Sequence, residues 1–332
     1  MASGEAGGSS ESFDPSPARD DARFGEGLEA ALIETCRPRL SDIRWFRTDW
    51  QRGGALTGYA DYETDEGPRR AMVKLPVPPR ELAWLRRLQP TEHDAGPVVP
   101  ELFASGDATD GYDLAWAVME RLPHGPLDSQ WDGRQWELLI EALGRFQRAA
   151  SAVPVDKPPR QEDWPAIIDR ARRNVRDQRP PDAQHWNQSL KALQKKLKTI
   201  VAQWDARPTD HWCHGDVHLA NAMTRVPPPD GPALIFDLAE VHAGHWVEDA
   251  VYLEHIYWGR ERQLPDARFA KQVARQRKTL GLPGDPDWPH FANLRRALLA
   301  AAAPAYMREE GQAAHLQGAL AVLDQALAQI KA

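Results

Sequence analysis

A change in hydrophobic periodicity near residue 123 divides this sequence into two unlike parts. Before it, short segments of strand-like composition are separated by turn signals such as Gly67-Pro68. These segments are 42–49, 58–64, 70–75 and 112–120. One helix interrupts them, because 78–88 opens with two prolines and then places leucines along one face. Strands with a single helix among them predict an antiparallel sheet that carries one helix.

After residue 123 the apolar residues recur at helical spacing. The three long stripes cover 136–150, 190–204 and 316–330. Between the second and the third lies a loop-rich stretch, 209–246, in which the apolar run 233–236 predicts a small strand. Because loops held by a helical scaffold often carry chemistry, this stretch is the first candidate for a functional site.

The length of 332 residues favours two lobes, which we place at 23–119 and 120–332. Residues 1–22 are rich in Gly, Ser, Asp and Pro and contain almost no apolar side chain. Such a segment cannot bury enough surface to offset its ordering entropy, so we expect a disordered tail. A short helix is predicted next, around 28–35, because the apolar residues there share one face.

Composition narrows the class of function. Hydrophobic residues make up 42% of the chain and charged residues 27%, and the net charge of −7 does not resemble the basic footprint of a nucleic-acid-binding protein. No apolar run is long enough to span a bilayer, and the N-terminus lacks a signal-peptide pattern. We therefore expect a cytoplasmic protein without nucleic-acid or membrane partners. Cys36 and Cys213 are expected to be reduced thiols, since two distant cysteines make no disulfide framework.

The segment HGDVHLAN, residues 214–221, carries the strongest chemical signal. Asp216 and Asn221 lie five positions apart, and Asp237 follows Asn221 by sixteen positions at the end of an apolar run. Phosphoryl transfer needs a base near the attacking hydroxyl and oxygen ligands for the magnesium that neutralises the phosphates. Asp216 could accept the hydroxyl proton, while the Asn221 amide oxygen and the Asp237 carboxylate are the hard ligands that magnesium prefers.

This segment resembles the catalytic loop of the aminoglycoside phosphotransferase and choline kinase family, a relative of the protein-kinase H-R-D-x-x-x-x-N loop. The stretch IFDLAEVHAGHWVEDAV, residues 235–251, is similar to the metal-binding segment of that family. The resemblance implies an α+β, bilobal protein-kinase-like fold, with an antiparallel sheet lobe carrying one helix and a mainly helical C-terminal lobe. It also implies residues that support the catalytic loop, namely His214, His218 and Asp249. Glu240, soon after the metal aspartate, is a candidate for an additional metal group.

The N-terminal half carries further matches in the order of the family. The residues implied in nucleotide binding are Gly53, Gly54, Thr57, Lys74, Glu81, Glu120 and Leu122. The first three lie in a segment that resembles the nucleotide loop, whose backbone N–H groups approach the phosphates. Lys74 and Glu81 resemble the kinase ion pair that holds the α- and β-phosphates. The last two close a strand where the family has its hinge, and their backbone atoms would bond the adenine.

The resemblance therefore implies a kinase that uses ATP or GTP with Mg²⁺ and phosphorylates a hydroxyl of a small molecule. The acceptor would be an aminoglycoside-like antibiotic, an amino alcohol or a sugar, so antibiotic inactivation and housekeeping metabolism both stay open. Four residues on the next expected helix bear on this choice: Glu248, Glu254, Tyr257 and Trp258. They would suit a cationic acceptor through charge and cation–π contact, or they form a solvated face above an aromatic core contact.

Two other classes of function fit parts of the sequence. His214, Asp216 and His218 alternate as the ligands of zinc or of a dinuclear metal pair do, which would make the protein a metal-dependent hydrolase. A second ligand cluster would have to come from His242 and His245, whose loop is better explained by the metal-binding segment. The third class is a non-catalytic nucleotide-binding protein of kinase-like fold. It is disfavoured because the lysine, the base and the metal acid are all present.

Overall fold

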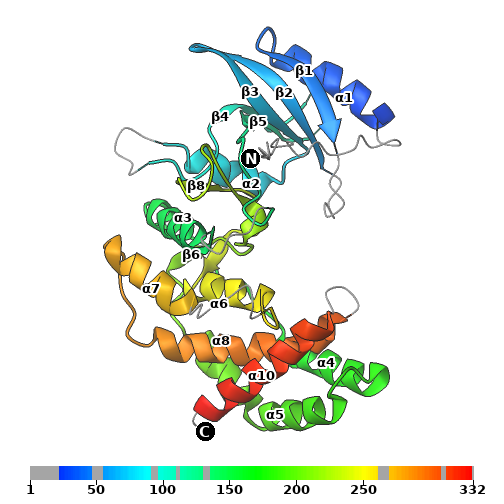
Figure 1. Ribbon diagram of the computed structural model, residues 1–332, viewed down its shortest axis with the longest axis vertical. Coiled ribbons are helices and arrows are strands. Elements are labelled where there is room, and N and C mark those ends of the chain that lie inside the picture. Colours follow the sequence, from blue (N-terminus) through cyan, green and yellow to red (C-terminus); the bar gives the residue numbers. More distant parts are fainter. Residues whose placement is uncertain are drawn as a thin grey trace, which may run out of the picture. The chain divides into compact units, whose positions relative to one another are not determined.

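The computed structural model describes residues 22–46, 55–90, 96–109, 113–129, 135–260, 269–307 and 312–330 (Figure 1). The chain divides into two compact units, the first made of Met1–Leu82 with Glu101–Arg121 and the second of Ala83–Pro100 with Leu122–Ala332. The segment 83–100 belongs to the second unit although it precedes residue 120. Its Trp84 ring packs there against Phe146 and Trp212, with centroids 6.4 and 4.9 Å away.

A five-stranded antiparallel sheet, in the order β1-β2-β3-β5-β4, forms the body of the first unit. Its strands are β1 (Leu40–Phe46), β2 (Leu56–Thr64), β3 (Gly67–Leu75), β4 (Leu102–Gly106) and β5 (Trp116–Glu120). The four predicted strands correspond to β1, β2, β3 and β5, whereas β4 was not predicted. The longest of the expected segments, 112–120, is strand only from Trp116 onward.

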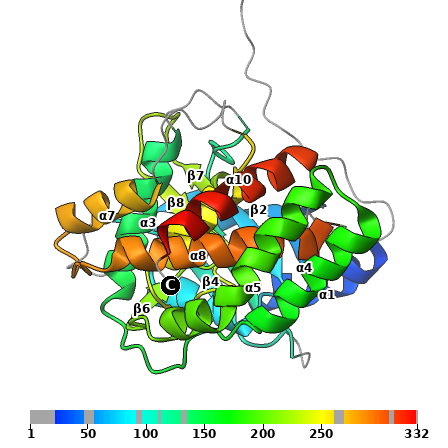
Figure 2. The same ribbon diagram turned by 90° about the horizontal axis from the view of Figure 1, so that it is seen from below.

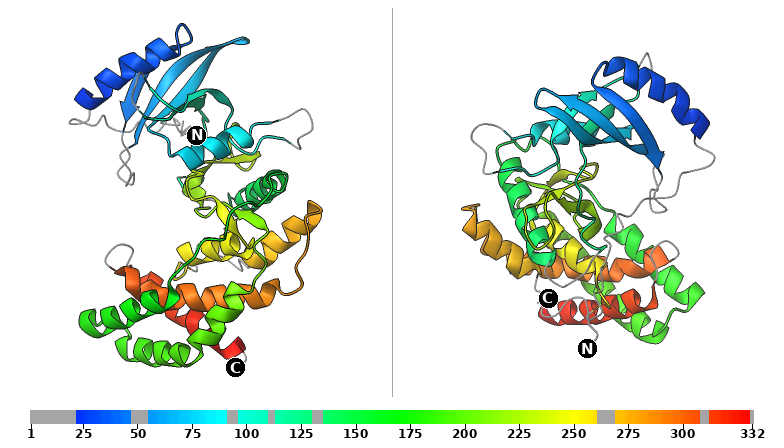
Figure 3. Two further views of the ribbon diagram at one scale, coloured as in Figure 1. Left: turned by 180° about the vertical axis from the view of Figure 1, so that it is seen from behind. Right: turned by 45° about the horizontal axis from the view of Figure 1, so that its top comes forward.

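Helix α1 (Ala22–Thr35) lies alongside this sheet, as both views in Figure 3 show for the blue helix and strands. Leu28 and Leu32 of the helix join Val73 and Val118 of the strands in one buried cluster. In β3 burial alternates along the strand, so Lys74 faces away from the side of its buried neighbour Val73. The predicted helix around 28–35 is thus confirmed, while residues 1–21 of the expected tail lie outside the described residues.

Helix α2 (Pro79–Arg87) is the helix predicted among the strands. Proline at its start costs no helical hydrogen bond, and Glu81 in the first turn together with Arg86 and Arg87 in the last turn complements the helix dipole. Leu82 and Leu85 are buried along one face. The helix begins in the first unit and continues into the second after Leu82.

The second unit is mainly helical. Its helices are α3 (Gln135–Ala150), α4 (Trp164–Gln178), α5 (Ala183–Asp205), η1 (Leu219–Asn221), α6 (Val247–Ile256), α7 (Phe269–Thr279), α8 (Trp288–Ala302), η3 (Ala303–Tyr306) and α10 (Ala313–Gln329). The three predicted stripes are confirmed as α3, α5 and α10. Figure 2 shows α4, α5, α8 and α10 from below.

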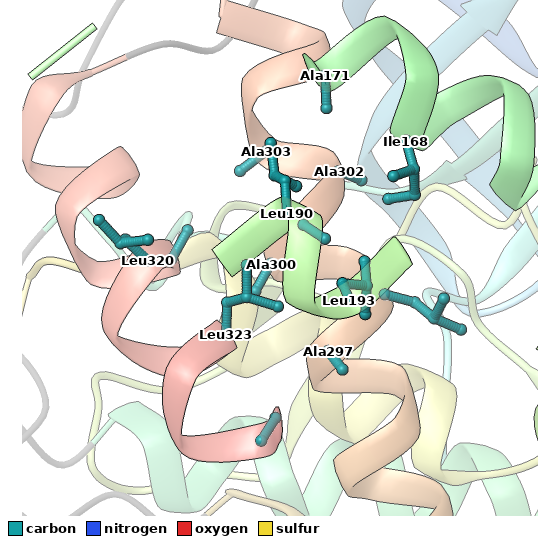
Figure 4. Packing of buried hydrophobic residues seen from close by; sticks show 14 of the residues in the cluster. Ile168, Ala171, Leu190, Leu193, Ala297, Ala300, Ala302, Ala303, Leu320 and Leu323 are labelled. Atoms are coloured by element: carbon teal, nitrogen blue, oxygen red, sulfur yellow. The ribbon is translucent and has the colours of Figure 1, made fainter. Parts of the chain in front are cut away.

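One large apolar core joins α4, α5, α8 and α10. In Figure 4, Leu190 and Leu193 of α5 lie over Ala297 and Ala300 of α8, and Leu323 of α10 lies beside them. The alanines on α8 allow close approach, so larger side chains from the neighbouring helices can fill the space at interior packing density. This core is the scaffold on which the loop-rich stretch is mounted.

Two small antiparallel ladders organise that stretch. Strand β6 (His211–Cys213) pairs with β9 (His242–Gly244), and β7 (Ala222–Thr224) pairs with β8 (Ala233–Ile235), the small strand that the apolar run predicted. A sheet with its helix and a helical unit with short ladders confirm the predicted α+β fold class. Among the residues that the structure describes, no helix is both long and apolar enough to cross a bilayer.

Candidate functional site

His214 directly follows β6 and is completely buried. Its Nδ1 accepts a hydrogen bond from the Asp216 backbone nitrogen at 3.3 Å, so Nε2 carries the proton and donates it to the Phe236 carbonyl at 3.0 Å. Burial lowers the pKa of this imidazole, which stays neutral at pH 7. Both ring nitrogens are therefore occupied by backbone groups, which braces the loop and leaves His214 without a nitrogen for a metal.

The turn after His214 depends on a glycine and on a buried acid. Gly215 has a φ of +83°, and a Cβ atom there would lie 2.4 Å from the Glu240 carbonyl oxygen. Only glycine fits both conditions. Asp249, in the first turn of α6, accepts hydrogen bonds from the backbone nitrogens of His214 and Gly215, both at 2.9 Å. Helix α6 thus holds the loop by its backbone, and the next side chain projects from a fixed turn.

That next side chain is Asp216, and both of its carboxylate oxygens are bonded. Tyr252 on α6 donates its hydroxyl to Oδ1 at 2.5 Å, and Asn221 donates Nδ2 to Oδ2 at 3.1 Å. His218 Nε2 lies 3.6 Å from Oδ1. Burial by itself would raise the pKa of Asp216, but the hydrogen bonds from His218 and Tyr252 outweigh it and lower the pKa to about 2. The carboxylate is ionised at neutral pH and can accept a hydroxyl proton.

Asn221 and Asp237 are brought together by the β7–β8 ladder. Asn221 ends η1 just before β7, and its carbonyl accepts a hydrogen bond from the Phe236 nitrogen at 2.9 Å, next to Asp237. Asn221 bonds Asp216 through its amide nitrogen, which directs its amide oxygen elsewhere. Asp237 has a φ of 56°, a left-handed conformation that an aspartate tolerates better than most side chains. An amide oxygen and a carboxylate are hard donors, so this pair fits a magnesium ion.

Lys74 and Glu81 form an ion pair within the first unit. Lys74 Nζ lies 2.7 Å from Oε1 and 2.8 Å from Oε2 of Glu81, and the two side chains are 19% and 7% exposed. Thr57 is the cross-strand partner of Lys74 in the β2–β3 pair. Directly opposite residues in an antiparallel pair share one face of the sheet, so Thr57 lies beside the lysine. A nucleotide loop that runs into β2 would therefore end next to this ammonium group.

The other residues expected to bind nucleotide are placed as follows. Gly53 and Gly54 lie outside the described residues. Glu120 ends β5, and its backbone nitrogen already donates to the Glu101 carbonyl at 2.8 Å. Its side chain and that of Leu122 are buried, so only their backbone could meet a ligand. The role of Glu120 and Leu122 in nucleotide binding stays a prediction.

The comparison of this sequence with known families decides its membership. The model of the phosphotransferase enzyme family matches residues 57–294, most of the chain. The chain belongs to the phosphotransferase enzyme family. Among curated protein sequences, none matches it.

Solved structures agree with this phosphotransferase in fold. The GDP complex of wild-type aminoglycoside 2′-phosphotransferase-IIIa is 15% identical, with a TM-score of 0.51 over 93% of this chain and 99% of the other. An aminoglycoside phosphotransferase from Alicyclobacillus acidocaldarius is 14% identical, with a TM-score of 0.52 over 91% and 96%. A spectinomycin phosphotransferase solved with ADP and spectinomycin is 14% identical, with a TM-score of 0.51 over 89% and 93%. At these identities the likeness establishes the kinase-like fold.

Tyr252 is the residue of the phosphotransferase site that sequence reasoning missed. It lies one helical turn after Asp249, so both project from the same side of α6 toward the catalytic loop. That spacing was available in the sequence, but it becomes informative only when the start of the helix is known.

A second missed feature is the group around Glu248. Cys213, His242 and Glu248 offer ligand atoms within 4.8 Å of one another, as a metal site would. However, Arg207 binds Glu248 Oε1 through Nε at 3.0 Å and Nη2 at 3.0 Å. Burial raises the pKa of the Cys213 thiol well above its ordinary value, and the neighbouring carboxylates add to this. The group is therefore organised around an arginine rather than a cation site.

The four residues considered for a cationic acceptor are already engaged. Glu248 is held by Arg207, and Glu254 accepts from Arg296 Nε at 2.7 Å and Nη2 at 2.9 Å. Tyr257 packs edge-on against Trp136, with centroids 4.5 Å apart. Trp258 packs against His255 and His315. The geometry supports the aromatic core contact of the second interpretation, whereas Glu248 and Glu254 are bound by arginines rather than forming a solvated face.

Proposed function

We propose that this phosphotransferase moves the γ-phosphoryl group of ATP or GTP to a hydroxyl group of a small molecule. One observation carries the proposal: an ionised aspartate, Asp216, is fixed by the neutral donors Tyr252 and Asn221, and the Asn221 backbone bonds the residue next to Asp237. The ADP and GDP complexes of two similar phosphotransferases support a nucleotide as donor.

In this proposal Asp216 is the base. Tyr252 and Asn221 fix the orientation of its carboxylate, so the ordering entropy of this group is already lost before the acceptor arrives. The acceptor hydroxyl approaches Asp216, which orients it for attack and takes its proton as the new phosphorus–oxygen bond forms, while the bond from the γ-phosphorus to the bridging oxygen breaks and ADP or GDP leaves. Hydroxyl groups are weak nucleophiles at neutral pH, and this positioning makes the oxygen available in the direction of the phosphorus.

Asn221 and Asp237 would hold Mg²⁺, which supplies positive charge to the triphosphate when bound. Lys74, oriented by both oxygens of Glu81, would neutralise the α- and β-phosphates. Thr57 would assist the nucleotide loop that contains Gly53 and Gly54. The backbones of Glu120 and Leu122 would hold the adenine, and His214, His218 and Asp249 would support the catalytic loop.

The test combines nucleotide consumption with product identification. The purified full-length protein is incubated with MgATP or MgGTP and a library of hydroxyl compounds, and the phosphorylated acceptor is identified by mass spectrometry. We expect nucleotide diphosphate release that depends on one acceptor class and that disappears in Asp216→Asn. Binding of nucleotide without transfer to any acceptor would instead favour the non-catalytic alternative. Activity with tightly bound zinc and no nucleotide would favour the hydrolase.

A further inference from the structure

A cavity of about 240 Å³ lies within the second unit, next to the catalytic loop. Gly215 and Tyr252 line it, and the Tyr252 hydroxyl bonds Oδ1 of Asp216. A molecule in this cavity would therefore touch the side chain that holds the proposed base. This position makes the cavity the natural place for the acceptor, and its lining indicates which acceptor chemistry it suits.

Each carboxylate of the described lining already has a partner. Glu248 is bound by Arg207 at 3.0 Å, and Asp249 by two backbone N–H groups at 2.9 Å. Glu162 accepts a hydrogen bond from Arg295, which also lines the cavity. No carboxylate among these lining residues is left to bind an ammonium group unless an arginine or a backbone group gives way.

The remaining polar groups of the wall add positive charge or none. Arg160 lines the cavity and binds Glu240 at 2.9 Å. Burial would lower the pKa of His242, but its hydrogen bond to Glu248 outweighs this and raises the pKa. Burial, with His315 and Arg295 nearby, lowers the pKa of His255 to about 3, so that this ring is neutral. Such a wall can exchange hydrogen bonds with hydroxyl groups and opposes a cation.

The rest of the lining is mostly apolar, and the space is small. Leu299 and Ala302 of α8, with Ala303 and Tyr306 of η3, belong to this part of the lining. The cavity volume of about 240 Å³ lies below the roughly 300 to 1,000 Å³ of typical ligand pockets. A molecule of roughly one ring that carries hydroxyl groups and a less polar edge suits this size and this lining.

We infer that the acceptor of this phosphotransferase is an uncharged polyhydroxylated molecule of about one ring, and that polycationic amino sugars are excluded. The inference rests on the proposed function. It follows from the described lining, in which every carboxylate is already bound. Displacing one partner of a buried ion pair would leave the other charge uncompensated.

The experiment uses matched acceptors that differ by one ammonium group. The full-length protein with MgATP or MgGTP is assayed against glucose and glucosamine, against inositol and its amino counterpart, and against further pairs from the hydroxyl library, with kanamycin as a polycation. We expect the uncharged member of a pair to have a kcat/KM at least about tenfold higher, and kanamycin to be inactive. Equal or better transfer to the aminated members overturns the inference and leaves the proposed function intact. No transfer to any member overturns the proposed function and the inference with it.

A variant tests the reason for the preference. Arg160→Gln removes the partner of the Glu240 carboxylate, and both side chains are about half exposed, so folding should survive. We expect the preference for the uncharged acceptor to fall about threefold, because a carboxylate near the cavity becomes available to an ammonium group. Arg172→Gln is the matched control, since that arginine pairs with Asp169 along α4, outside the cavity lining. An unchanged preference in Arg160→Gln, equal to the control, would contradict the role assigned to the paired charges.

Discussion

Lys74 in the first unit and Asp216 in the second are held in different ways. In the first, Lys74 is fixed by a carboxylate seven positions later, Glu81, at 2.7 and 2.8 Å. In the second, Asp216 is fixed by the neutral donors Asn221 and Tyr252, and Tyr252 lies 36 positions later on α6. One group is held by opposite charge from a neighbouring segment. The other keeps its negative charge, and its two closest donors are neutral, with His218 Nε2 farther away at 3.6 Å.

This difference suits the two tasks proposed for the units. A lysine paired with a glutamate is oriented by that acid and still presents its charge to phosphates, which carry several negative charges. A base must remain a strong acceptor, so a lysine or arginine partner would draw away the lone pairs that a hydroxyl proton needs. Neutral donors orient the carboxylate at a smaller electrostatic cost to its basicity. Substitutions in each unit should therefore fail in distinguishable ways.

The largest effect is expected for Asp216→Asn. The asparagine keeps the shape of the side chain but cannot take the hydroxyl proton, so kcat should fall by about 10² to 10⁴. Nucleotide affinity, measured by isothermal titration, should stay within about twofold of the parent, because the substitution leaves Lys74 and Glu81 in place. The control is Asp169→Asn, an exposed aspartate on α4 that pairs only loosely with Arg172 at 3.7 Å. Retention of most of the parent kcat in Asp216→Asn would remove the base from the proposal.

Lys74→Met in the first unit should lower the stability of the protein and weaken nucleotide binding, in contrast to the loss of kcat expected for Asp216→Asn. It leaves the nearly buried Glu81 carboxylate without its ammonium partner, and such losses cost about 3 kcal/mol of unfolding free energy. We expect a lower urea midpoint and a raised KM for nucleotide. In the double variant Lys74→Met with Glu81→Gln, most of the stability should return while the KM stays high. If stability does not recover in the double variant, the pair is not what makes the single variant unstable.

Tyr252→Phe sharpens the comparison, because it removes the hydroxyl that donates to Asp216 and keeps the aromatic ring. A hydrogen bond to a charged group contributes about 1.5 to 3 kcal/mol, so the less strictly oriented carboxylate should lower kcat by about tenfold or more. The KM for nucleotide should not change, and this separation of kcat from KM distinguishes positioning from loss of fold. Tyr62→Phe serves as control, since its hydroxyl bonds the Phe103 carbonyl at 3.5 Å and the Arg39 side chain, both in the first unit. A parallel change of kcat and stability in Tyr252→Phe would point to a purely structural role.

The sequence predicted what depends on neighbours along the chain. The strands β2 and β3, the helix α2 and the loop with Asp216 and Asn221 all follow from short spacings and local turn chemistry. Strand β4 was missed because its five residues are all half-buried, so no alternation marks them. Helix α4 was missed although Trp164, Ile168, Ala171 and Val175 repeat at helical spacing, because few apolar residues stand among many arginines.

What the sequence could not supply was the set of partners brought together by packing. Arg207 binds Glu248, which lies 41 positions later, and no local sequence pattern indicates that contact. The same holds for Arg295 and Glu162, which are 133 positions apart. In the structure, such distant pairs neutralise acids that the sequence alone suggested could bind a cation. Local motifs therefore predicted the chemistry of transfer, whereas the acceptor preference came only from tertiary structure.

The smallest effect concerns these neutralised acids and is seen in stability against pH. Burial would raise the pKa of Glu248, but His242, Arg295 and Arg207 together lower it from the ordinary 4.5 to about 2. A carboxylate with a depressed pKa stabilises the fold above its unfolded pKa and loses that contribution as pH falls toward the folded value. His242 has a raised pKa, so its contribution is present in acid and is lost as pH rises through that raised pKa.

Between about pH 5.5 and pH 3.5, then, the parent should lose about 1 kcal/mol more unfolding free energy than Glu248→Gln, measured from urea midpoints. If both proteins lose stability equally, Glu248 is not held as a charged partner of Arg207, and the cavity wall would have an acid to offer a cation after all.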